Sequence, residues 1–127
     1  MEQLDFVNKS VRAAAILTSS YVAGTVIENA QKFNQLVLNL AFTVGSLTDA
    51  QIKVEASVDG TNYYQVQEEV NTAGVITFVP LIYKLTATSS VVTKPVSINA
   101  KYIKISAIGT GTATSSSLAV NAILRKN

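Results

Sequence analysis

Apolar and polar residues alternate along most of the chain, and this pattern predicts β-strands. Residues 33–43 place their large apolar side chains at every second position. Residues 51–58 do the same, with charged or polar residues between them. Because successive side chains of a strand point to opposite faces, each segment is predicted to be a strand with one face in the core and one in water.

The dipeptide Asp59-Gly60 follows the second of these segments and predicts a tight hairpin. Gly60 is expected to take a positive φ, which β-branched residues resist. The returning strand is predicted over residues 61–67, with either Tyr63 or Tyr64 turned inward.

The remaining pattern predicts further short strands, and Pro80 divides one of them into an edge strand or two pieces. These strands are residues 11–18, 21–28, 74–85, 91–98, 102–108 and 117–126. Residues 65–71 have a helical composition but are predicted as a turn. Seven to nine short strands indicate an all-β, antiparallel β-sandwich, jelly-roll or immunoglobulin-like. We expect one sandwich domain over residues 11–127, preceded by an N-terminal arm over residues 1–10.

The predicted core is the apolar face of these strands. It comprises Leu36, Leu38, Leu40, Phe42, Ile52, Val54, Ala56, Ile103, Ile105, Leu118, Val120 and Ala122.

Charged residues make up only 14% of the 127-residue chain, against 48% apolar residues. Ordinary soluble domains carry about 25% charged residues. Either uncharged polar residues make up the surface, or a partner covers part of it, because open apolar patches promote aggregation. The net charge of +2 is scattered, so nucleic-acid binding is not expected.

The composition also restricts the chemistry. The chain has no His and no Cys, which rules out a Ser-His-Asp or Cys-His arrangement and leaves only carboxylates for zinc. The acids show no pairing typical of catalysis, so we expect no enzyme, no cofactor and no metal. Asp59 with Asn62 offers part of a calcium site, but a turn in which Asp59 binds its own backbone is the simpler interpretation. An outward Tyr63 or Tyr64 would suit a sugar or a protein interface.

Neither a signal peptide nor a membrane-spanning segment is expected. The N-terminal residues include Glu2 and Asp5 and lack a basic start followed by an apolar run. We therefore expect synthesis in a cytoplasm and no association with membranes.

Five segments of the chain resemble parts of known β-sandwich proteins. Residues 52–64 (IKVEASVDGTNYY) are similar to a Ser-x-Asp-Gly-x-x-aromatic hairpin of discoidin-like domains and small phage structural proteins. Residues 101–105, 109–112 and 117–120 resemble the C-terminal part of small tailed-phage virion proteins, and residues 20–27 suit the same group.

The resemblance implies a structural protein of a tailed-bacteriophage virion that decorates or cements the capsid. A head–tail connector or tail component is a subdivision of this class, and a carbohydrate-binding module of a fibre or secreted enzyme is the alternative. The expected partners are the major capsid protein, other virion proteins and further copies of the chain, with a trimer as the first guess. We place the partner-binding residues in the arm, at Glu2, Asp5, Phe6 and Lys9.

Overall fold

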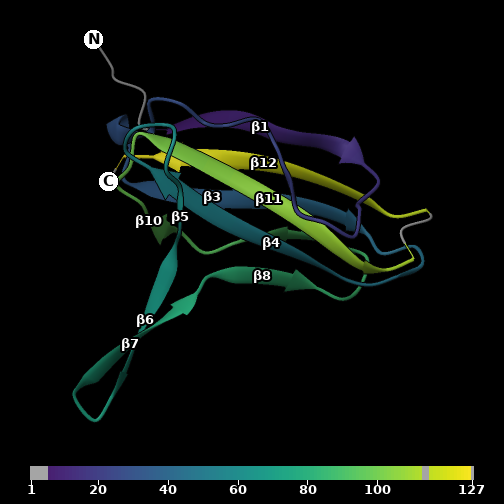
Figure 1. Cartoon of the computed structure of the whole chain (residues 1–127). Helices are drawn as coiled ribbons and strands as arrows, with labels where there is room; N and C mark the ends of the chain where they lie inside the picture. The colour runs from purple at the N-terminus through teal and green to yellow at the C-terminus, as the bar shows by residue number, and fades with distance from the viewer. Residues whose placement is uncertain (1–5, 113–114, 127) are drawn as a thin grey trace.

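The computed structural model describes residues 6–112 and 115–126, which form β-strands and one short 3-10 helix, η1 (Ala30–Lys32). The strands form two five-stranded sheets and a separate two-stranded ribbon. Figure 1 shows the two sheets as layers of a sandwich and the ribbon as a finger that projects from it. All strand pairs are antiparallel. The predicted antiparallel β-sandwich is confirmed.

The first sheet is built around β12 (Ser117–Arg125), which pairs with β1 (Phe6–Ala15) on one side and β3 (Gln35–Thr43) on the other. Two short strands, β9 (Ser89–Val92) and β10 (Val96–Ser97), share the far edge of β3. Strands from the start and the end of the sequence are therefore direct neighbours.

The second sheet is built around the long pair β4 (Leu47–Ser57) and β11 (Tyr102–Gly111). The short strand β2 (Val22–Ala23) pairs with β11, whereas β5 (Tyr64–Gln65) and β8 (Ile82–Leu85) both pair with β4. β4 begins earlier than predicted, because the turn before it is confined to residues 44–46, with Gly45 at φ +55°.

The core lies between the two sheets, where the period-two alternation of both layers meets. Of the twelve predicted core residues, eleven are buried and Ala56 is half-buried. The register was therefore predicted correctly. Other buried residues, such as Leu17, Ile27 and Ile98, come from segments whose alternation is less regular.

Two sequence-based predictions need correction. The described residues contain twelve strands, more than the seven to nine expected, because β2, β5 and β10 have only two residues each. Residues 65–71 were predicted as a turn but lie largely in strands. Pro80 ends β7 and separates it from β8, so of the two predicted alternatives the division into two pieces is confirmed.

The predicted arm also differs from the structure. Residues 6–10 belong to β1 and pair with β12, with Val7 packed against the core. Pairing with β12 gives these residues the backbone hydrogen bonds that an isolated arm would lack, so they are an edge strand. Residues 1–5 lie outside the described part of the chain.

Candidate interaction surface

The ribbon consists of β6 (Gln67–Thr72) and β7 (Val75–Pro80). Its turn, Ala73-Gly74, has positive φ at both positions, +52° and +86°, which is the hairpin geometry that matches the twist of the flanking strands. The backbone N–H of Gly74 donates to Asn71 Oδ1 at 3.0 Å and closes the turn. The local sequence thus forms a well-made hairpin away from the core.

Both faces of the ribbon carry exposed apolar side chains. Directly opposed residues share a face, so Phe78 lies beside Glu69 and Ile76 beside Asn71. The other face carries Val70, Val75 and Val79, and every residue of β6 and β7 is exposed. The exposed fractions of the large apolar residues are 41% for Val70, 62% for Val75, 53% for Ile76, 65% for Phe78 and 46% for Val79.

The ribbon joins the sandwich through a narrow neck. The Leu81 N–H donates to the Val66 carbonyl at 2.9 Å, so the chain leaves and re-enters the sandwich at one point. The Val66 N–H in turn donates to the Val54 carbonyl at 2.9 Å, which fixes the neck to β4. The ribbon is therefore anchored at its base while its apolar side chains face outward.

A second surface is the outer face of the first sheet along β3 and β12, which is uncharged from Ser117 to Asn121 and carries Arg125 at its end. Here Thr43, Ala41 and Asn39 lie opposite Ser117, Ala119 and Asn121. Asn39 Oδ1 is buried without a hydrogen-bond partner among the described residues. The outer face of the second sheet is different, because Lys53, Glu55 and Lys104 lie on it. One sheet thus presents small uncharged residues and the other presents charges.

The sequence-predicted partner residues are only partly placed. Phe6 is 55% exposed on β1, and Lys9 is exposed on the same strand. Their side chains leave opposite faces of β1, because they are three positions apart on a strand. Glu2 and Asp5 lie outside the described residues, so the grouping of the four residues stays a prediction.

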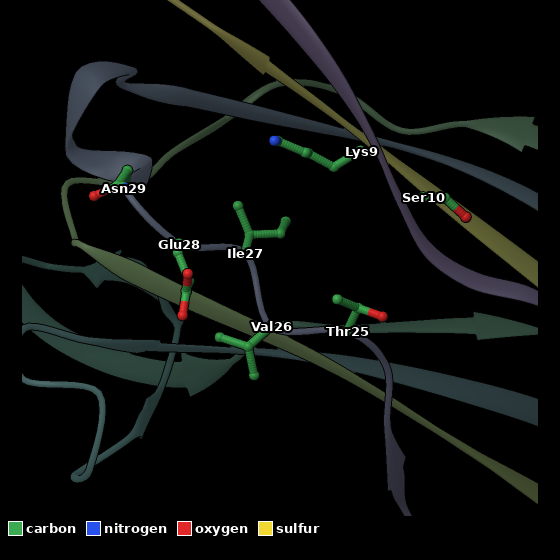
Figure 2. A pocket seen from close by; sticks show the side chains of 7 residues that line it. All are labelled: Lys9, Ser10, Thr25, Val26, Ile27, Glu28 and Asn29. Atoms are coloured by element: carbon green, nitrogen blue, oxygen red, sulfur yellow. The ribbon is translucent and has the colours of Figure 1, made fainter.

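Lys9 contributes to a shallow pocket of about 250 Å³ between β1 and residues 25–29. Figure 2 shows the Lys9 side chain extending from β1 above Ile27, while Ser10 points the other way. The side chains of Thr25 and Ile27 lie on the side toward β1, and those of Val26 and Glu28 lie on the opposite side (Figure 2). Lys9 and Glu28 therefore do not converge on a common point, and the pocket has no arrangement typical of catalysis.

The Asp59 loop is a self-contained turn. Asp59 Oδ1 accepts hydrogen bonds from the backbone N–H of Thr61 and of Asn62, both at 2.8 Å, and from Ser57 Oγ at 2.9 Å. Asn62 Nδ2 donates to Asp59 Oδ2 at 2.9 Å. The backbone bonds from Asn62 and Thr61, followed by the side-chain bonds, hold the pKa of Asp59 well below its usual range. Asp59 thus binds its own turn, as the simpler interpretation stated.

This loop is wider than the tight hairpin that was predicted. The last ladder pair joins Ala56 to Tyr64, so seven residues, 57–63, lie between the paired positions. Gly60 has φ +79°, which confirms the predicted backbone conformation, and a Cβ there would lie 3.2 Å from the Tyr102 ring. The carboxylate of Asp59 organises the extra residues.

The two adjacent tyrosines differ in their surroundings. The ammonium of Lys104 lies 3.9 Å from the centre of the Tyr63 ring, which occupies one face of that ring. Tyr64 is 74% exposed. A sugar would find one open aromatic ring here, without a second aromatic partner beside it.

Residues 6–112 and 115–126 contain no group of three or more acidic, His or Cys residues that could hold a metal ion. No helix in this part of the chain is long and apolar enough to cross a membrane.

Sequence reasoning missed the ribbon as a surface. Its signal is the run Val75, Ile76, Thr77, Phe78 and Val79, which departs from strict alternation. Such a run is typical of a strand that is covered on both faces. The pattern predicted an edge strand of the sandwich or two short pieces, and not a projecting surface.

Comparison with known proteins identifies the fold but no family. No protein-family model and no curated protein match the chain. Among solved structures, the chain is similar to the PBSX exported protein XepA, with a TM-score of 0.65, 9% identity and 95% of the chain covered. The chain spans only 37% of the length of that protein.

Two further structures share the fold. One comes from Bacillus endospore appendages that form disulfide-linked pili, with a TM-score of 0.54 and 12% identity, covering 98% of this chain and 91% of the other. The other belongs to infectious bursal disease virus Gx strain, with a TM-score of 0.52 and 10% identity, covering 95% of this chain and 32% of the other. At these identities the likeness shows the fold alone: this chain is a β-sandwich of a kind that occurs in phage-associated, viral and pilus proteins.

Proposed function

We propose that the chain is a non-enzymatic structural protein of a tailed-bacteriophage virion that decorates the capsid. The observation that carries the proposal is the presence of two surfaces open to a partner on one small domain, the largely apolar ribbon β6–β7 and the uncharged part of the outer face of β3 and β12. Large exposed patches of this kind mark interaction sites.

The occurrence of this fold in phage-associated, viral and pilus proteins supports an assembly role. The disulfide linkage named for the endospore pili is not open to this chain, which has no cysteine. Its contacts would be non-covalent, with modest affinity per copy multiplied over many copies on a symmetric shell.

The outer face of β3 and β12 is the surface we assign to the shell. It lacks charge along Ala41, Asn39 and Asn121, which help to line a hollow of about 270 Å³, so it can approach another surface without burying an unpaired ion.

Co-sedimentation with undecorated shells tests the proposal. The shells would be assembled from the major capsid protein of the phage that carries the gene for this chain. Wild-type protein should pellet with the shells, whereas Asn121→Lys, which places a charge on the assigned face, should bind at least about tenfold more weakly. Thr61→Lys adds the same charge on the exposed Asp59 loop and is the control.

A wild-type protein that stays in the supernatant would contradict the decoration role. Binding that tolerates Asn121→Lys would keep the role but place the contact elsewhere, with β1 and its Phe6 and Lys9 as the next candidates. A glycan array with Tyr64→Ala as the comparison tests the carbohydrate-binding alternative.

A further inference from the structure

We infer that the ribbon β6–β7 is the self-association element of this protein and docks on the sandwich of a second copy of the chain. The inference deepens the proposed function, because it names the surface that links neighbouring copies on a shell. It starts from the stability of the ribbon itself. A two-stranded hairpin is marginally stable in water unless its side chains pack against something else.

The ribbon lacks the features that keep an edge strand solitary. Natural sheet edges are protected by lysines, prolines, bulges or a covering segment. Residues 67–80 contain no Lys or Arg, and Pro80 stands only at the base. The backbone edges and the apolar side chains near the tip, among them Val75 and Ile76, are therefore open to another protein.

The charge distribution points to a second copy as the partner. The ribbon carries Glu68 and Glu69 and no basic residue, so its net charge is −2. The rest of the chain holds all ten basic residues and six acidic ones, a net charge of +4. Exposed lysines such as Lys32 and Lys94 lie on the sandwich. Each copy therefore offers an acidic, apolar ribbon and a basic body, which are complementary.

The distribution of apolar residues favours neighbouring copies over the shell. Phe78 and Ile76 lie on one face of the ribbon, and Val70, Val75 and Val79 lie on the other. A shell surface beneath the ribbon would cover one of these faces. A ribbon inserted between two neighbouring copies of the chain is covered on both, and head-to-tail contacts of this kind can close into a ring.

Sedimentation equilibrium of the isolated full-length chain tests the inference. Wild-type protein should form a closed oligomer in a concentration-dependent way. The double variants Ile76→Thr with Phe78→Thr, and Val70→Thr with Val79→Thr, should each weaken association roughly tenfold or more. The first removes both large apolar residues of one face, and the second removes two of the three valines of the other. Threonine keeps the strand preference of the ribbon. Val58→Thr with Ile16→Thr changes two exposed apolar residues outside the ribbon and outside the outer face of β3 and β12, and should associate as the wild type does.

The electrostatic part has its own pair of variants. Glu69→Lys places a basic residue on the ribbon and should weaken association, with the effect reduced at high salt. Glu28→Lys makes the same charge change on the sandwich and should not weaken it. Circular dichroism should show the same fold for every variant, since the ribbon contributes nothing to the core.

The outcomes separate this inference from the decoration role. A wild type that is monomeric at all concentrations, or an oligomer that tolerates both ribbon variants, overturns the inference. If the ribbon variants remain oligomeric but no longer pellet with shells, the ribbon binds the shell; the inference fails and the decoration role stands. Variants that become monomeric, with a wild type that never binds shells, support the inference and contradict the decoration role.

Discussion

At the scale of single residues, the period of two accounts for most of the burial in the sandwich, although Val37, between the inward-facing Leu36 and Leu38, is also buried. Leu38 is 1% exposed and lies on the inner face of β3, whereas Val58, just past the end of β4, is 78% exposed. Both are apolar, and each belongs to a segment in which apolar and polar residues alternate. Position relative to the end of the ladder, and not residue type, separates them.

Leu38→Ala should therefore lower the free energy of unfolding by about 2–5 kcal/mol, because it leaves a cavity between the two sheets. Val58→Ala removes similar chemistry from the surface and should change it by less than about 0.5 kcal/mol. Urea denaturation of the two variants measures the difference. A Leu38→Ala effect below about 1 kcal/mol would mean that the core collapses around the missing side chain.

Asp59 provides a prediction on pH. The hydrogen bonds from Asn62 and Thr61 favour the charged carboxylate and lower its pKa in the folded state. The unfolded value is about 3.9. A depressed folded pKa gives a stabilisation that is complete above the unfolded value and is lost as the pH falls toward the folded value.

Thermal melts of the wild type and Asp59→Asn from pH 6 down to pH 2 test this. The wild type should melt at a higher temperature near pH 6, and the gap should shrink below about pH 4. The other carboxylates titrate in both proteins and cancel in the comparison. A gap that stays constant down to pH 2 would show that the loop is not held by the charged form.

At the scale of elements, the sequence specified the long strands better than the short ones. β3, β4, β11 and β12 have at least nine residues each, and their alternation predicted both position and register. β2, β5 and β10 have two residues each, too few for a pattern to show. These short strands form because the neighbouring long strands pair with them. The residues that decide this pairing lie far away in the sequence, so a local pattern does not reveal it.

The strand β1 was missed over residues 6–10 for a related reason. Its alternation is weak, and Val7 is half-buried while Lys9 is exposed on the same side. Its identity as a strand depends on β12, which lies more than a hundred residues away in the sequence. The polar residues of this segment favoured the prediction of an arm, whereas pairing with the distant β12 makes the segment a strand.

Deletion of residues 1–10 should consequently lower the melting temperature clearly. The deletion removes the pairing of residues 6–10 with β12 and the packing of Val7, and it exposes an open strand edge. Deletion of residues 1–5 leaves this pairing in place and is the matched comparison. Equal melting temperatures for the two deletions would show that residues 6–10 contribute nothing to the sandwich.

At the scale of the whole molecule, the sandwich and the ribbon differ in where their apolar side chains lie. The sandwich buries the apolar side chains of its inner faces, and the ribbon exposes its own on both sides. The sequence predicted the sandwich because its pattern repeats. It did not predict the ribbon as a surface, because a short apolar run reads the same whether the chain itself or a partner covers it.

Replacing residues 67–80 by the turn Asn-Gly should remove the ribbon and leave the sandwich folded. The hydrogen bond between Leu81 and Val66 shows that the ends of the ribbon are close enough for a short turn. The shortened protein should have the melting temperature that the wild type has when it is dilute enough to be monomeric. The melting temperature of the wild type should rise with protein concentration, because association stabilises the folded state, and that of the shortened protein should not. A concentration dependence that survives the replacement would place self-association on the sandwich.

The central position of β12 also constrains how the protein is made. β1 and β3 both pair with residues 117–125, so neither can complete its place in the first sheet until that segment has left the ribosome. Synthesis proceeds at about 5–20 residues per second and folding from non-local strands is slow, so the nascent chain waits with open strand edges. A stop codon placed before Ser117 should therefore give an insoluble product in the cell, although it leaves β1, β3 and β4 intact in the sequence.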